Sequence, residues 1–217
     1  MRQTWKLCSI LALLPTALSA QVTLSAYGGA VRTAYSGDGP PSTKYHVRLG
    51  PVVGVAADFF VASDVAISVQ PSYSQRGTNI AFVDVEADKY RDSTAVRTDY
   101  VSIPVLAKVF AARQRTFVTG GLDFGYLLSA ERDDGSGPTD AKNLFNDYDL
   151  SMVLGFGVAL HKRRPEITVE LRYIHGLLNL ADSEAVSAGD EPLPVRFRAA
   201  GFQLLGSFGF TLGSGRH

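Results

Sequence analysis

The chain has 217 residues with 21 basic and 21 acidic side chains, so its formal charge is zero. A neutral chain lacks the basic excess with which proteins hold nucleic acid, so we expect no nucleic-acid partner. Cys8 is the only cysteine, which excludes disulfides and cysteine-based metal sites from the rest of the chain. The length fits one large all-β domain.

Residues 1–20 have the three parts of a secretory signal peptide. The basic residues Arg2 and Lys6 come first, an apolar run covers residues 7–14, and small residues end the segment. The apolar run is too short to cross a bilayer as a helix, which favours cleavage after export. We expect a cleaved signal over residues 1–20 and one domain over residues 21–217, with a formal charge of 19 − 21 = −2.

The first three predicted strands cover residues 22–34, 47–59 and 65–76. The third has the clearest alternation, because valine, isoleucine and tyrosine side chains occupy one parity while serine and glutamine occupy the other. Successive side chains of a strand point to opposite faces, so this strand has one apolar and one small polar face. A polar Gly/Pro segment over residues 35–44 separates the first two strands, and a tight connection at residues 61–64 precedes the third.

Five more strands follow with the same alternation. They cover residues 99–110, 117–128, 148–160 and 166–175, and a final strand that ends near residue 212. Long polar loops over residues 77–96 and 131–147 alternate with short basic turns at residues 112–115 and 161–165. This rhythm places every long loop on the same side of the sheet.

The pattern predicts an all-β fold, namely an eight-stranded antiparallel up-and-down transmembrane β-barrel in the cell outer membrane. A strand needs about 9 to 11 residues to cross a bilayer, and closure satisfies every backbone polar group in lipid. Pro51, Pro71 and Pro104 each remove a donor from a predicted strand, so we expect bulges or strand ends there. Outer-membrane lipid is the expected surrounding, and we expect a monomer.

Aromatic side chains on the apolar faces gather at the strand ends, as the two interfacial belts of a membrane barrel require. The predicted interfacial residues near the long loops are Tyr73, Tyr126, Tyr148 and Tyr173, and those near the short turns are Phe59, Phe208 and Phe210.

Several segments resemble the PorT-like outer-membrane β-barrel domain family common in Bacteroidota. The similar pieces are Q-P-S-Y-S-Q-R-G at residues 70–77, Y-V-S-I-P-V-L-A-K at 100–108, G-G-L-D-F-G-Y at 120–126, G-F-G-V at 155–158 and E-L-R-Y-I-H-G-L-L-N-L at 170–180. The resemblance implies a barrel in the outer membrane of a Gram-negative envelope. It also implies an association with protein secretion, because the founding member has one.

Five charged side chains share the inward parity of their strands, namely Arg48, Lys108, Asp123, Glu170 and Arg172. The lumen of an eight-stranded barrel is just wide enough for side chains to fill it, so we expect these charges to form a structural salt-bridge network. A proton or ion route along them is the less favoured interpretation. A general acid/base pair made of Asp123 and Glu170 is weaker still, because nothing places it near a substrate-sized opening.

The favoured function is a non-enzymatic barrel with a structural or interaction role, with envelope or secretion proteins as partners. A soluble lipocalin-like periplasmic binder, whose apolar faces would point inward, is the alternative. A lipid-modifying enzyme is less favoured, because neither His46, His161 nor His175 has a serine placed to act with it. Residues 133–140 read as a solvated acidic loop, since they lack the order of an EF-hand, and we expect no cofactor, catalytic site or metal.

Overall fold

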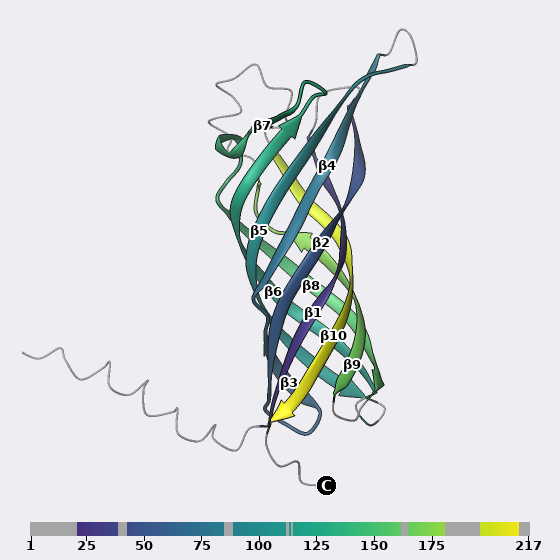
Figure 1. Cartoon of the computed structure of the whole chain (residues 1–217), viewed down its shortest axis with the longest axis vertical. Helices are drawn as coiled ribbons and strands as arrows, with labels where there is room; N and C mark the ends of the chain where they lie inside the picture. The colour runs from purple at the N-terminus through teal and green to yellow at the C-terminus, as the bar shows by residue number, and fades with distance from the viewer. Residues whose placement is uncertain are drawn as a thin grey trace, which may run out of the picture.

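The computed structural model describes residues 21–38, 43–84, 89–111, 113, 115–161, 165–180 and 196–212, so the predicted signal lies outside the described residues. The chain forms a tall barrel of tilted strands (Figure 1). Its elements are β1 (Val22–Asp38), β2 (Thr43–Phe60), β3 (Val65–Val69), β4 (Ser72–Asp84), β5 (Lys89–Ala111), β6 (Thr116–Asp133), β7 (Pro138–Asp140), the 3-10 helix η3 (Lys142–Leu144), β8 (Tyr148–His161), β9 (Glu166–Gly176) and β10 (Arg196–Leu212).

The strands close into a ring of eight antiparallel positions. β1 pairs with β2 and β10, and the ring continues from β2 through β3 and β4 to β5, β6, β8 and β9. β3 and β4 together occupy one position, because β5 pairs with both in a single register, with Val69 opposite Val105 and Ser72 opposite Ser102. The predicted eight-stranded antiparallel barrel is therefore confirmed. Closure leaves no open sheet edge within the ring.

The predicted strand over residues 65–76 is interrupted at Gln70 and Pro71. Neither Pro71 nor Pro104 on β5 has a backbone N–H, so Pro71 removes a donor on the side of β2 and Pro104 removes one on the side of Gln70. Their carbonyls are still used, since Gln70 N donates to Pro104 O at 3.0 Å and Val55 N donates to Pro71 O at 3.0 Å. Pro71 thus lies at a strand end, as expected, whereas Pro104 lies within β5.

Pro51 lies in a β-bulge of β2. Val47 pairs with Thr78 and Val52 pairs with Ser74, so the four residues between them on β2 face three on β4. The extra residue bends the strand, so Pro51 needs no hydrogen-bonding partner on β4.

The prediction of a long loop over residues 77–96 is wrong. β4 continues to Asp84, β5 begins at Lys89, and the two strands pair along this whole stretch. Figure 1 shows this hairpin extending beyond the rest of the barrel. Threonines at 78, 94 and 98 are good strand formers, and a strand above the bilayer needs no apolar outer face. Residues 131–147 are also partly ordered, because they include β7 and η3.

Exposed apolar side chains of the strands form an outward-facing band. Those on β6 are exposed from Val118 to Leu128, a span that matches the length of a membrane-crossing strand. The interior buries hydroxyl, amide and charged side chains such as Ser68, Thr98 and Gln203, together with three apolar clusters. This arrangement is the reverse of a lipocalin, so that alternative is wrong. No helix within the described ranges is long and apolar enough to cross a membrane.

A register row marks where the apolar band ends on the side of the long loops, called here the loop side. Tyr73, Val101 and Tyr126 pair side by side on β4, β5 and β6, and Tyr126 continues the row to Tyr148 on β8. The next outward row toward the loops is polar, with Asp99 paired to Gln75 and Ser129. A change from an aromatic row to a polar row at the next position is typical of a membrane interface.

Candidate functional site

The loop-side cluster consists of Arg76 on β4, Asp123 on β6 and Asp149 on β8. The Arg76 guanidinium donates to Asp123 Oδ2 at 2.8 Å and to Asp149 Oδ2 at 2.9 Å, and all three side chains are almost fully buried. The guanidinium carbon also lies 5.1 Å from the ring centroid of Tyr100, in cation–π geometry. One arginine thus links strands from several positions of the ring across the lumen.

The cluster contains two carboxylates and one guanidinium. Asp123 and Asp149 each keep one buried oxygen, Oδ1, without a hydrogen-bond partner in the protein. Ser151 donates a further hydrogen bond to Asp149 Oδ2 at 3.0 Å. The cluster therefore depends on Arg76 for its charge balance.

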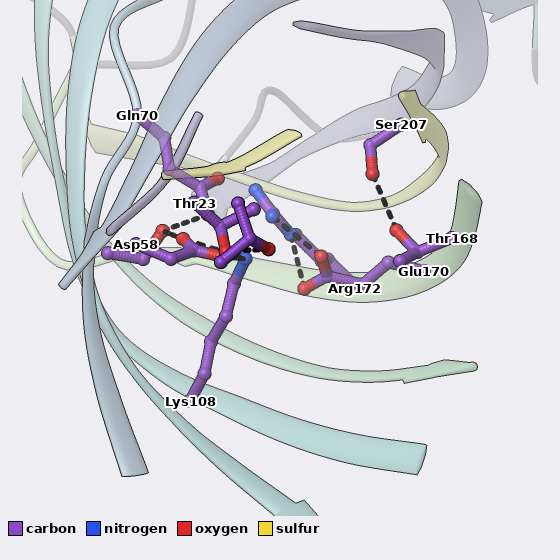
Figure 2. Close-up of polar contacts among 10 residues, drawn as sticks. Thr23, Asp58, Gln70, Lys108, Thr168, Glu170, Arg172 and Ser207 are labelled. Atoms are coloured by element: carbon purple, nitrogen blue, oxygen red, sulfur yellow. Dashed lines mark hydrogen bonds and ion pairs between the residues drawn. The ribbon is translucent and has the colours of Figure 1, made fainter. Parts of the chain in front are cut away.

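A second group, the turn-side cluster, lies nearer the short turns and contains Asp58, Lys108, Glu170 and Arg172 (Figure 2). Lys108 Nζ on β5 donates to both oxygens of Asp58 on β2, at 3.1 and 2.8 Å. The Ser68 hydroxyl also donates to Asp58, and Gln70 Nε2 donates to Ser68 Oγ at 2.7 Å. This chain of contacts ties β2, β3 and β5 together from inside the barrel.

Glu170 and Arg172 form the other half of the turn-side cluster. They are two residues apart on β9, so both point inward, and Arg172 Nε and Nη2 donate to the two carboxylate oxygens at 2.7 and 2.8 Å. The Arg172 guanidinium carbon lies 5.9 Å from the ring centroid of Tyr27 on β1. A bidentate pair of this kind holds both side chains in fixed positions inside the lumen.

Two cavities beside the turn-side cluster are very small. One cavity of about 20 Å³ lies among Lys108, Glu170, Arg172 and Tyr27, and another of about 30 Å³ lies between Lys108 and Phe117. A single water needs roughly 10–15 Å³ of such space. These cavities can hold one or two waters each, and they cannot hold an organic substrate.

A cluster of buried apolar side chains, called here the apolar plug, lies in the loop-side part of the interior. Leu144 and Phe145, from the segment after β7, are buried among side chains of β4, β5, β6 and β10. Asn146 N donates to Leu180 O at 2.9 Å, which joins this segment to the one after β9. The plug consists of Ile80, Val96, Tyr100, Leu127, Ala130, Ala141, Leu144, Phe145, Leu180 and Ala199.

Four of the five predicted lumen charges, Lys108, Asp123, Glu170 and Arg172, are buried inside the barrel. They lie in two clusters rather than in one network. Arg48 is half-buried near the β2 bulge, beside Gly77, and takes no part in the ion pairs described above. A purely structural role for the five residues remains a prediction.

Sequence reasoning did not single out Asp58, Arg76 and Asp149 as partners of these charges. Each has the inward parity of its strand, since Asp58 alternates with Val55 and Phe59 and Asp149 precedes the outward run that starts at Leu150. Arg76 is the last residue of the predicted strand over residues 65–76 and was not considered as a charge partner. All three lie within predicted strands, so parity places them inward, but parity does not say which charges they pair with.

All seven predicted interfacial aromatics have outward parity. Their side chains are exposed or half-buried, and several contact one another, with ring centroids 5.5 Å apart for Tyr126 and Tyr148 and 5.2 Å apart for Phe208 and Phe210. Tyr173 lies 5.2 Å from Phe202 on the adjacent strand. Their role as interface anchors remains a prediction.

The three described histidines lie on three different strands, β2, β8 and β9. His175 is half-buried and its described contact is with Tyr173, whose hydroxyl lies 3.4 Å from Nδ1. His46 and His161 are exposed on β2 and β8. Tyrosine beside histidine at the rim of an apolar band is what an interface residue pair would show.

The acidic loop over residues 133–140 uses its carboxylates for local turns. Asp133 Oδ1 accepts from Gly135 N at 2.9 Å, and Asp134 Oδ1 accepts from Ser136 N at 3.1 Å and from Ser136 Oγ at 2.6 Å. These hydrogen bonds lower the pKa of Asp134. The loop borders an open cavity of about 320 Å³ that Arg132, Asp140 and neighbouring residues line. No group of metal-ligating side chains was found within the described ranges.

A family model described as the outer membrane protein beta-barrel domain matches residues 18–182. This match covers most of the chain and includes the charged lumen. The chain belongs to the outer membrane protein beta-barrel domain family. As a member of that family it is an outer-membrane protein. The description does not specify the PorT group, so the PorT-like resemblance stays a prediction.

Solved structures with a similar course of the chain share little sequence with this family member. The attachment invasion locus protein Ail of Yersinia pestis is 12% identical over 87% of this chain and 98% of its own, with a TM-score of 0.49. OprG of Pseudomonas aeruginosa is 11% identical over 90% and 98%, with a TM-score of 0.46. Neisserial surface protein A is 11% identical over 87% and 97%, with a TM-score of 0.46. No curated protein sequence matches the chain.

Proposed function

We propose that this protein is a non-enzymatic outer-membrane barrel with a closed lumen, which acts through its outer wall, loops and turns. The observation that carries the proposal is the filled interior. The apolar plug, the loop-side cluster and the turn-side cluster follow one another along the barrel, and the turn-side cavities hold only waters. A solute would have to break several buried ion pairs in order to pass, which is costly.

The interior also argues against a catalytic role for its charged groups. Asp123 is engaged by Arg76 and Glu170 by Arg172, so neither carboxylate is poised beside the other as an acid/base pair. Within the described ranges, the apolar plug and the small turn-side cavities leave no substrate-sized path to either carboxylate. A structural or interaction role needs only the outer surfaces, namely the loops and turns at the two ends of the barrel.

Conductance across a planar bilayer tests the closed lumen. We expect the purified barrel to give no discrete conductance steps, whereas an Arg76→Ala, Lys108→Ala, Arg172→Ala and Phe145→Ala combination serves as the opened control. A heat-modifiable gel shift shows that each preparation is folded. Discrete ion currents through the unchanged protein would overturn the proposal.

The finer proposal is that the barrel is an accessory of protein secretion or envelope assembly. Short turns face the periplasm and longer loops face outward in barrels of this kind, so partners would contact Arg115 at a turn or Asn143 at a loop, both exposed. Photo-crosslinking groups at these two positions should capture envelope proteins in intact cells. Leu171, on the lipid-facing wall, is the matched control position. Equal labelling at all three positions would argue against a specific partner.

A further inference from the structure

An apolar groove of about 700 Å³ lies on the outer wall of the barrel, toward the short turns, where β1, β2, β3 and β10 meet. Ala26 and Ala57 lie in it, and Phe59, Pro71, Phe208 and Phe210 line its sides. The other lining side chains are also apolar, apart from Ser25.

The pairing register explains why the wall is hollowed here. Ala26 lies between Phe208 on β10 and Val55 on β2, so a small side chain separates two large ones. One row further toward the turns, Ala57 lies between Leu24 on β1 and Val69 on β3. The two alanines sit in neighbouring rows on adjacent strands, which produces one continuous depression.

We propose that this groove seats an acyl chain of a phospholipid from the membrane leaflet on the turn side. The groove is continuous with the lipid-facing band, since Leu24, Val55, Phe59, Phe208 and Phe210 are all exposed on that band. An unfilled hollow in an apolar medium forfeits the dispersion contacts of its lining, and a flexible hydrocarbon chain can recover them. Ser25 is the polar residue of the lining, and the other lining side chains offer no hydrogen bond that would select a protein partner instead.

The depth of the groove selects the leaflet. Phe59 lies next to the end of β2, and Phe210 pairs with Leu24 close to the start of β1, so the groove opens toward the short turns. Short turns face the periplasm in outer-membrane barrels, which places the groove in the periplasmic leaflet. The inference does not depend on the lumen being closed.

Native mass spectrometry of the full barrel, released from vesicles of palmitoyl-oleoyl phosphatidylethanolamine, tests the proposal. The unchanged protein should retain a single phospholipid. Ala57→Phe should lower the lipid-bound fraction by about tenfold. The added ring displaces part of the acyl chain, and loss of contact for two of its methylenes removes about that much affinity. Ala107→Phe is the matched control, because Ala107 is exposed on β5 away from the groove and receives the same bulk.

Each other outcome decides against the proposal. Equal lipid retention by Ala57→Phe and Ala107→Phe would show that lipid binds elsewhere. A dimer peak in place of a lipid adduct, lost in Ala57→Phe, would assign the groove to a second copy of the chain. Ala26→Leu provides a second filling variant if Ala57→Phe does not give the gel shift of a folded barrel.

Discussion

Arg76 on β4 and Asp149 on β8 are joined by a 2.9 Å ion pair, although β5 and β6 lie between their strands in the ring. The same guanidinium holds Asp123 on β6, and the side chains of all three residues are at most 4% exposed. A contact of this kind fixes the barrel's cross-section from inside, in addition to the backbone ladder that fixes it around the wall.

Replacing Arg76 by methionine should destabilise the barrel strongly. The change leaves Asp123 and Asp149 buried together without a counter-charge, and breaking a buried pair in this way costs about 3–5 kcal/mol. Urea unfolding in lipid vesicles measures the free energy. Asp149→Asn should cost less than about 1 kcal/mol, because an amide oxygen still accepts from Arg76 and the cluster loses its excess negative charge.

Arg97→Met is the matched control for that experiment. Arg97 pairs with Asp99 at 3.1 Å, but its side chain is 39% exposed on the outer surface. Exposed ion pairs contribute about 0–1 kcal/mol. Equal losses for Arg76→Met and Arg97→Met would mean that the lumen cluster contributes no special stability.

Phe145→Ala should loosen the apolar plug without opening a conducting path. The side chain is buried among residues of several strands, and truncating a buried phenylalanine costs about 3–5 kcal/mol in a protein core. The loop-side cluster beneath the plug remains intact, so conductance should stay absent. Hydrogen exchange should rise at the amide of Asn146, which bonds Leu180. Unchanged exchange there would show that Phe145 does not hold the two loops together.

Much of the fold follows from strand parity because a membrane barrel imposes it on every strand. Val118, Leu122 and Phe124 had to alternate with Thr119 and Asp123 for β6 to face lipid and lumen at once. Parity carries no information on where a strand stops once it leaves the bilayer. The extension of β4 and β5 beyond the membrane was therefore missed, since polar strands and polar loops have the same composition there.

The sequence predicted that the charged side chains of the candidate site point inward. It did not predict which of them form ion pairs with each other. Asp123 was expected inside, but its partner Arg76 is 47 residues away in sequence, and only the ring order of β4 to β6 brings them together. The plug could not be read from the sequence, because Leu144 and Phe145 lie in a segment with no strand alternation. Loop side chains reach the lumen through the path of the chain, which no local pattern encodes.

The rim of the barrel should lose stability in acid through Asp99. Burial alone would raise the pKa of Asp99, but hydrogen bonds from Arg97, Gln75 and Ser129 outweigh it and lower the pKa overall. A carboxylate whose folded pKa is depressed stabilises the protein above its unfolded pKa, near 3.9, and loses that contribution as the pH falls toward the folded value. Asp99 lies in the polar row outside the aromatic row, so protons reach it from solvent.

The comparison of wild type with Asp99→Asn isolates this effect from other carboxylates. The difference in unfolding free energy between the two proteins should be constant at neutral pH and should shrink below about pH 4. Urea unfolding at a series of pH values measures it. A difference that is independent of pH would show that Asp99 is not ionised in the folded barrel or is ionised equally in both states.

Two neighbouring glycines of β6 should respond differently to alanine. A Cβ on Gly121 would lie 2.2 Å from Val105 O on β5, whereas a Cβ on Gly120 would meet nothing closer than the Leu154 side chain at 3.4 Å. A backbone oxygen held in the ladder cannot move aside, while the end of a leucine side chain can. Gly121→Ala should therefore cost about 1–3 kcal/mol of unfolding free energy, as overpacking does, and Gly120→Ala less than about 1 kcal/mol. Equal tolerance of both changes, with both proteins folded by gel shift, would mean that β5 and β6 are further apart at this point than the register implies.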